Sequence, residues 1–197
     1  MRLENAISRF AKGEIIIVTD HHERENEGDL IFAAQFVTPE KINFLTKFGR
    51  GLICATITEQ HASQLQLARQ EVRNSNRLTC AFTTSIDASN LTTSGISASD
   101  RCQTIAALAK QEAKVQDFAT PGHVFPVIAH SNGLVAREGH TEASIELCVR
   151  AKLFPAAVIC EILAEDGSSA SSLYLNKLAE EHNLPIISVA ELVESFI

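Results

Sequence analysis

The chain has 197 residues, of which 45% are hydrophobic and 21% are charged. This composition is typical of a folded globular protein and excludes an intrinsically disordered chain. Acidic residues outnumber basic ones by 24 to 17, which gives a net charge of −7. We therefore expect no bulk attraction to nucleic acid or to an anionic membrane surface. Because no apolar run reaches the length of a membrane span or forms a signal-peptide core, we expect a cytoplasmic protein.

The five cysteines are scattered and show none of the close pairs that zinc sites use. We expect reduced thiols that mostly fill the core. They are Cys54, Cys80, Cys102, Cys148 and Cys160. No internal repeat, low-complexity tract or long linker divides the sequence, so we predict a single domain over residues 1–197.

Seven apolar, β-branched runs predict strands. They cover residues 14–20, 29–36, 52–58, 81–88, 123–130, 156–163 and 185–189. Between them, Thr38, Ser97, Thr141 and Ser188 are predicted to begin helices as N-caps. The loop after the first run is too short for a crossover helix, so at least part of the sheet is antiparallel. We predict the α+β class, with a mixed, partly antiparallel sheet flanked by helices.

The loop between the first two predicted strands, residues 20–29, carries five carboxylates and Arg24 within ten positions. Like charges this close repel and raise one another's pKa unless a cation lies among them. Such a loop suits a hard divalent metal ion or a general base. The alternative is a solvated acidic turn, although its place at the end of a sheet favours a functional site.

Three further groups can take part in chemistry. The segment from Arg137 to Thr141 precedes a predicted helix and can bind a phosphate, or it can simply begin the helix. His123 follows a Pro-Gly turn and can act as an acid or base, or serve as a structural histidine. Glu161 ends a strand predicted to be buried, so its carboxylate must be paired, metal-bound or protonated.

Other candidates have simpler interpretations. Cys54 lies inside an apolar strand with no activating neighbour, so we interpret it as a core residue. His21 and His22 are adjacent, and on an extended backbone at most one of them can reach the site. We interpret three other histidines as surface or structural residues, namely His61, His130 and His182.

Seven motifs occur in order along nearly the whole chain: Arg24–Leu30, Gly51–Cys54, Phe82–Ala88, Gly95–Ala98 with Asp100–Arg101, Pro121–Pro126, Gly139–Ala143, and Ile159–Glu161 ahead of Asp166–Gly167. Together they resemble the 3,4-dihydroxy-2-butanone 4-phosphate synthase family of riboflavin biosynthesis. The resemblance implies a lyase that converts D-ribulose 5-phosphate to L-3,4-dihydroxy-2-butanone 4-phosphate and formate. It also implies a homodimer whose sites use residues from both subunits.

The resemblance assigns roles to individual residues. It implies that Glu25 and His140 are metal ligands, and that His123 and Glu161 are essential for catalysis. The substrate contacts it implies are Arg24, Glu25, Asp29, Arg137, Glu138, Gly139, His140, Thr141 and Glu161. The implied cofactor is Mg²⁺, with no organic cofactor. Because histidine is an unusual ligand for Mg²⁺, we expect Mn²⁺ to substitute.

Some positions depart from the family pattern. His21 and His22 stand where the family usually continues the acidic run, Thr120 replaces an Arg found in many relatives, and Ser94 replaces a Thr. Because this loop carries fewer carboxylates than the family pattern, we expect weaker metal binding. The two imidazoles lead us to expect activity to fall below about pH 6.5. Some relatives also carry a zinc-dependent GTP cyclohydrolase II; without a zinc-type cysteine cluster, we expect the monofunctional form here.

Two other functions are compatible with these residues. One is a non-catalytic protein that binds a sugar phosphate. The other is a metal-dependent pentose-phosphate isomerase or aldolase that stops at the enediolate. Retention of Glu25, His123, His140 and Glu161 together argues against the first, and the products formed would distinguish all three.

Overall fold

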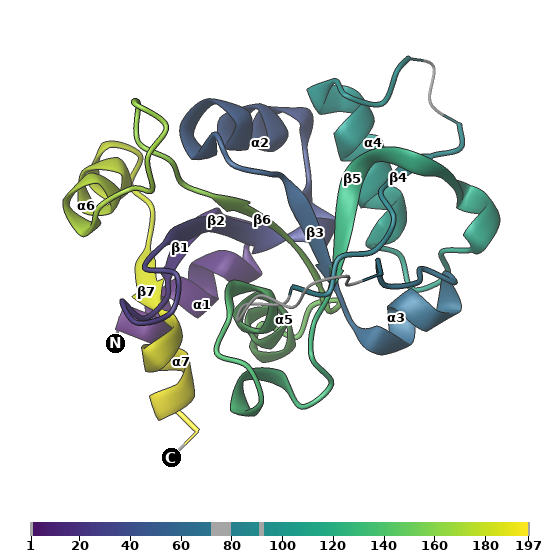
Figure 1. Cartoon of the computed structure of the whole chain (residues 1–197). Helices are drawn as coiled ribbons and strands as arrows, with labels where there is room; N and C mark the ends of the chain where they lie inside the picture. The colour runs from purple at the N-terminus through teal and green to yellow at the C-terminus, as the bar shows by residue number, and fades with distance from the viewer. Residues whose placement is uncertain (1, 72–79, 91–92, 197) are drawn as a thin grey trace.

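The computed structural model describes residues 2–71, 80–90 and 93–196. A seven-stranded sheet in the order β4-β5-β3-β6-β2-β1-β7 crosses the centre of the molecule (Figure 1). The strands are β1 (Ile16–Thr19), β2 (Gly28–Ala33), β3 (Cys54–Ile57), β4 (Ile86–Ala88), β5 (Phe118–Ile128), β6 (Ala156–Glu161) and β7 (Ile186–Ser188). β1 pairs with β7 and β3 with β5 in parallel, whereas the other neighbouring pairs are antiparallel. The predicted mixed sheet and the antiparallel pairing of its first two strands are confirmed.

Helices cover both faces of this sheet (Figure 1). Apolar side chains of α2, α4 and α6 pack on one face, and those of α1, α5 and α7 pack on the other. Adjacent residues of β1 alternate between these two layers, with Ile16 in the second and Ile17 in the first. The helices are α1 (Arg2–Ala11), α2 (Pro39–Phe44), α3 (Glu59–Gln64), α4 (Ala98–Leu108), α5 (His140–Arg150), α6 (Ser172–Glu181) and α7 (Val189–Glu194). The predicted α+β class is confirmed.

The helix starts predicted from N-caps are correct in three places out of four. Thr38, Ser97 and Ser188 each accept a hydrogen bond from the backbone N–H three residues later. Thr141 is wrong as an N-cap, because α5 already begins at His140 and the extended residue before it is Gly139. Glycine has no side chain to cap the helix, so the first backbone N–H groups of α5 remain available.

The predicted and observed strand boundaries differ most at the edge of the sheet that β4 forms. The predicted strand over residues 81–88 is regular only from Ile86 to Ala88, and the predicted strand at 123–130 begins earlier, at Phe118. The run at 29–36 ends as a strand at Ala33 and continues as a short 3₁₀ turn. Among the cysteines, three are buried, as predicted, and two are half-buried. Within the described residues, no helix combines the length and the hydropathy needed to cross a bilayer.

Candidate active site

Strand register brings two carboxylates together at one end of the sheet. Asp29 on β2 lies opposite Glu161 on β6. On each strand the residue two positions further in, Ile31 or Ile159, packs in the layer that contains α5. Because alternate residues of a strand share a face, Asp29 and Glu161 both point toward α5. The sheet therefore presents a pair of acids beneath the beginning of that helix.

The hairpin loop between β1 and β2 folds around the carboxylate of Asp20. Its oxygens accept hydrogen bonds from the backbone N–H groups of Glu25, at 3.1 Å, and Glu27, at 2.9 Å. Arg24 donates to Asp20 at 2.8 Å and also forms an ion pair with Glu25. These bonds turn the acidic segment back on itself, and this conformation places the side chain of Glu25 beside α5.

The loop and the start of α5 meet at His140. Its Nδ1 lies 3.9 Å from a carboxylate oxygen of Glu25 and 3.7 Å from Oδ1 of Asp29. One ligand atom each from Asp20, Glu25 and His140 lie within 4.8 Å of one another. Two residues far apart in sequence, Glu25 and His140, are thus brought together as the sequence predicts. Asp20 was not predicted as a ligand, although its position at the carboxyl end of an apolar strand was a usable signal.

The donor set fits a hard divalent cation. One buried side-chain atom beside the cluster, Asp29 Oδ1, has no hydrogen-bond partner, and leaving such a group unsatisfied is costly. Burial, the largest cause, raises the pKa of Asp29 well above its usual range, and the nearby Glu161 raises it further. Burial lowers the pKa of His140 to about 4. His140 is therefore a neutral imidazole at pH 7, the form that can ligate a metal ion.

Two arginine side chains lie at the beginning of α5. Arg137 donates to the buried carboxylate of Glu142 at 2.6 Å and to the Cys80 sulfur at 3.2 Å. A Cβ on Gly139 would collide with the guanidinium of Arg137 and meet that of Arg24 at 3.0 Å. Two arginines therefore lie against the backbone that opens the helix. This arrangement can bind an anion, since guanidinium groups and free N–H groups are combined there.

Glu161 lies at the edge of the same pocket. Its Oε2 accepts a hydrogen bond of 2.8 Å from the backbone N–H of Leu52. A Cβ on Gly51 would come within 2.6 Å of that oxygen, so a glycine permits this close approach. Burial raises the pKa of Glu161. A carboxyl group with a raised pKa can carry a proton nearer to neutral pH.

These side chains line one small cavity of about 70 Å³, which has room for an ion and a few waters. Its walls are Arg24, Glu25, Glu27, Asp29, Cys54, Cys80, Phe82, Val127, Arg137, His140, Thr141, Ile159 and Glu161. Cys54 does face the pocket, and burial raises its pKa strongly, which agrees with an unactivated thiol. Glu27, Cys80 and the anchoring residue Glu142 were not among the predicted site residues.

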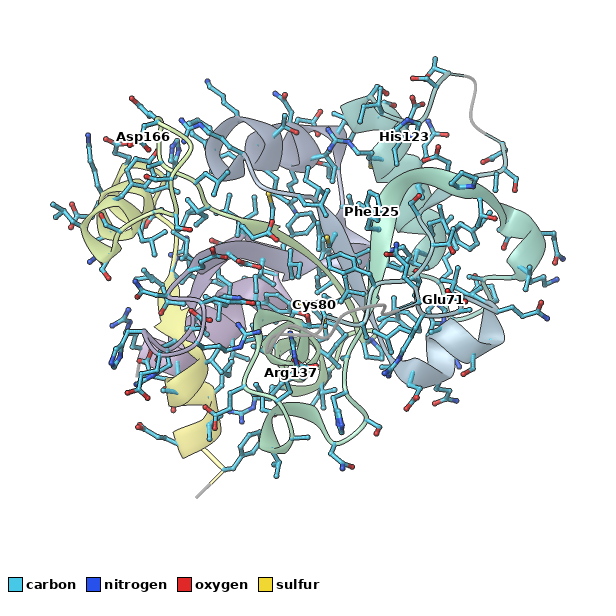
Figure 2. The ribbon with its side chains drawn as sticks, in the orientation of Figure 1. Glu71, Cys80, His123, Phe125, Arg137 and Asp166 are labelled. Atoms are coloured by element: carbon cyan, nitrogen blue, oxygen red, sulfur yellow. The ribbon has the colours of Figure 1, made fainter. Side chains whose placement is uncertain are left out.

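Some predicted residues lie elsewhere. His123 does not line this cavity, and Figure 2 shows it on a different part of the molecule from Arg137 and Cys80. Glu138 is exposed and is also absent from the cavity wall. Neither His21 nor His22 reaches it. Their rings lie side by side, with centroids 4.1 Å apart, because the chain turns there instead of being extended.

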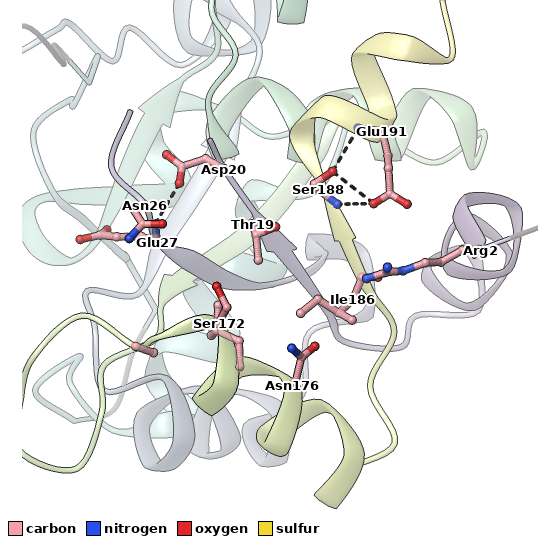
Figure 3. A pocket seen from close by; sticks show the side chains of 12 residues that line it. Arg2, Thr19, Asp20, Asn26, Glu27, Ser172, Asn176, Ile186, Ser188 and Glu191 are labelled. Atoms are coloured by element: carbon pink, nitrogen blue, oxygen red, sulfur yellow. Dashed lines mark hydrogen bonds between the residues drawn. The ribbon is translucent and has the colours of Figure 1, made fainter. Parts of the chain in front are cut away.

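A larger cavity of about 460 Å³ also borders the hairpin (Figure 3). Residues of α1, α6, β7 and α7 line it together with loop residues such as Asn26. Asp20 and Glu27 border it, but Glu25, His140 and Glu161 do not. By size alone this cavity would be the candidate active site. The smaller cavity is the better candidate, because carboxylates, arginines and an unsatisfied buried carboxylate oxygen converge there.

Comparison with known proteins identifies the family. Residues 4–195 match the family model for 3,4-dihydroxy-2-butanone 4-phosphate synthase. A protein of that name from Oceanobacillus iheyensis is 46% identical over 193 residues, which cover 98% of this chain and 93% of the relative. The riboflavin biosynthesis protein RibBA from Aquifex aeolicus is 47% identical over 194 residues. The chain spans 48% of that relative's length.

Solved structures give the same result. A crystal structure described as 3,4-dihydroxy-2-butanone 4-phosphate synthase in complex with two magnesium ions superposes with a TM-score of 0.93 and 35% identity. The match covers 98% of this chain and 95% of the other. This chain belongs to the 3,4-dihydroxy-2-butanone 4-phosphate synthase family, as its motifs predict. Its fold is the fold of a family associated with riboflavin biosynthesis.

Proposed function

We propose that this protein converts D-ribulose 5-phosphate to L-3,4-dihydroxy-2-butanone 4-phosphate and formate, as a lyase of riboflavin biosynthesis. The observation that carries this proposal is the convergence of Asp20, Glu25 and His140 beside two arginines and Glu161, in a chain of this family. The site combines a place for a divalent cation, a place for a phosphate and a proton carrier.

We propose Mg²⁺ as the cofactor, with Mn²⁺ as a substitute and without an organic cofactor. Glu25 and His140 would hold the ion, joined by Asp20. A relative whose structure contains two magnesium ions supports this choice. When bound, the ion supplies Lewis-acid stabilisation of negative charge on the sugar oxygens. Metal binding would also compensate the buried carboxylates that the folded chain brings together.

The substrate is anionic and the protein carries a net negative charge, so local cations must bind the phosphate. Arg24 and Arg137 supply the cations, and the backbone N–H groups of Gly139, His140 and Thr141, at the beginning of α5, add hydrogen-bond donors. The phosphate is remote from the reacting carbons, and binding it orients them. Asp29 and Glu25 would then face the sugar hydroxyls. Glu138 is exposed in this structure, so its contact with substrate requires the loop to move.

Proton transfer is assigned to Glu161 and His123. Glu161 borders the cavity with a raised pKa, which suits a group that gives and takes protons at carbon and oxygen. His123 lies outside the cavity formed by its own chain. Its participation requires that a second subunit bring it to the site.

We therefore propose a homodimer whose active sites are shared. Two features of the single chain support it: His123 lies away from the cavity, and Leu52, whose backbone N–H donates to Glu161, is 44% exposed. A partner surface that carries His123 would cover the substrate. We also propose that the protein works in the cytoplasm without nucleic-acid or membrane partners, in keeping with its charge of −7.

The test is incubation of the purified protein with ribulose 5-phosphate labelled with ¹³C at C4. With Mg²⁺ we expect labelled formate and an unlabelled four-carbon phosphate. EDTA should abolish the reaction, and either Mg²⁺ or Mn²⁺ should restore it. An isomeric pentose phosphate would instead identify an isomerase, and binding without turnover would identify a non-catalytic protein. Either result would contradict the proposal.

A further inference from the structure

The segment that carries His123 interrupts the pairing of β4 with β5. Ile86 pairs with Val124, but its neighbour Asp87 pairs with Ala119. Residues 120–123 therefore form extra length in β5 opposite two adjacent residues of β4. Such irregularities re-aim side chains. Gly122 lies so close to the backbone of Ile86 that a Cβ would collide with it, and its N–H donates to Ser85 Oγ at 3.1 Å.

Asp87 binds His123 at two points. One carboxylate oxygen, Oδ1, accepts the backbone N–H of His123 at 2.9 Å. The other, Oδ2, lies 2.7 Å from Nδ1 of the imidazole. A carboxylate oxygen can only accept, so this contact requires the ring proton to be on Nδ1. The other ring nitrogen, Nε2, then carries the lone pair that accepts a proton.

The loop before α4 packs on this hydrogen bond. Gly95, at φ +100°, lies so close that a Cβ would collide with Asp87 Oδ2 and His123 Nδ1. The loop is itself fixed by Asp100, which accepts the N–H of Gly95 at 3.2 Å and the hydroxyl of Thr93. The Asp87 side chain is only 14% exposed, whereas that of His123 is 39% exposed. One side of the imidazole is thus held, and the ring remains accessible.

We propose that Asp87 is a positioning residue for His123: it fixes the ring orientation and the Nδ1–H tautomer, and Gly95 is required for this contact. The proposal rests on the proposed function, in which His123 transfers a proton. Asp87 acts only through His123 and does not itself reach substrate. The physical reason is that a base held in one tautomer and one orientation needs no reorganisation before proton transfer.

The first test is Asp87→Asn, which keeps the size of the side chain and removes its charge. An amide N–H can donate to Nδ1, so the ring proton should move to Nε2. In ¹⁵N-histidine-labelled protein we expect His123, assigned from its missing signals in His123→Gln, to change from the Nδ1–H to the Nε2–H tautomer. We expect kcat to fall about 100-fold or more, with KM changed less than about threefold.

Gly95→Ala is the second variant, because its methyl group should separate Asp87 from His123 and lower kcat without changing either side chain. Asp117→Asn is the matched control. In the turn before β5, that carboxylate accepts the backbone N–H of Lys114 at 2.8 Å, and it takes no part in the proposed site. It should leave kcat and the His123 signals unchanged.

The proposal is overturned if Asp87→Asn leaves either kcat or the tautomer of His123 unchanged. The same holds if a folded Gly95→Ala protein keeps full kcat. Absence of formate production by the wild-type protein would instead overturn the proposed function. The tautomer measurement needs no turnover, so it would still decide whether Asp87 sets the protonation of His123.

Discussion

Two buried histidines, His61 and His140, show how environment separates structural from functional residues. Burial lowers the pKa of both. The Nε2 of His61 lies 2.8 Å from the carbonyl oxygen of Leu108, which joins α3 to the end of α4. The Nδ1 of His140 instead faces the carboxylates of Glu25 and Asp29. His61 is a satisfied structural histidine, one of the two interpretations that the sequence left open, whereas the Nδ1 of His140 is available to a metal ion.

The lowered pKa of His61 predicts how the stability of the protein depends on pH. Because its pKa in the folded state lies below the unfolded value of about 6.5, the unfolded chain binds more protons as the pH falls. Its contribution to stability is therefore complete above about pH 6.5 and declines below it. His61→Gln should cost about 1 kcal/mol at pH 7.5, or about 2–4 °C in Tm, and less at pH 5.5.

Thermal unfolding of both proteins across this pH range would measure the effect. His130→Gln is the matched control, since that histidine is exposed. If the difference between wild type and His61→Gln stayed constant or widened in acid, His61 would not titrate as the structure implies.

At the scale of elements, the site depends on how α5 docks on the sheet. Thr56 on β3 and Ser144 on α5 are both buried, and their hydroxyl oxygens lie 2.7 Å apart. The Ser144 hydroxyl also donates to the carbonyl of Thr141 at 2.8 Å, in the first turn of the helix. This chain of bonds fixes the end of α5 that carries His140.

A double-mutant cycle measures this connection. Thr56→Val and Ser144→Ala should each cost about 1–2 kcal/mol, because each leaves a buried polar group with one bond fewer. The double variant should cost less than the sum by about 1 kcal/mol, since the second change removes a group that has already lost its partner. Urea unfolding gives the three values. Strict additivity would show that the two hydroxyl groups do not interact.

Elements with a strong local signal could be predicted from the sequence. Apolar β-branched runs located all seven strands, and side-chain caps located the starts of α2, α4 and α7. α1 was not predicted, because it buries only Ala6 and Phe10 among charged residues. The irregular pairing of β4 with β5 was also missed, although the Pro-Gly pair before His123 is a sequence signal for such an irregularity.

In the molecule as a whole, the sequence predicted which residues can take part in the reaction, but not how those residues are placed relative to one another. Glu25, His140 and Glu161 were each predicted from their own segments, and the structure brings them to one cavity. Asp20 was missed as a ligand despite the signal of its position at the end of an apolar strand, and Asp87 was missed because its role depends on His123, which approaches it only in the folded chain. His123 lies away from the cavity, so it can act there only if a second chain brings it to the site.

Shared sites predict complementation between inactive variants. Glu25→Ala and His123→Ala should each be inactive as homodimers. In a heterodimer of the two, one site loses both residues and the other keeps both. After subunit exchange at equal concentrations, about one quarter of wild-type formate production should return, because half the dimers are mixed and half their sites are intact. If a verified heterodimer remained inactive, His123 and Glu25 would not act in one site across the interface.

In the proposed site, the acidic hairpin and the start of α5 hold one divalent ion between Glu25 and His140. Titration of Mn²⁺ followed by electron paramagnetic resonance tests it without turnover. Glu25→Gln and His140→Gln should each weaken binding at least about tenfold. Glu23→Gln, a control in the same loop with a side chain 80% exposed, should bind as wild type does. Equal Mn²⁺ affinity in all four proteins would show that Glu25 and His140 do not hold the ion.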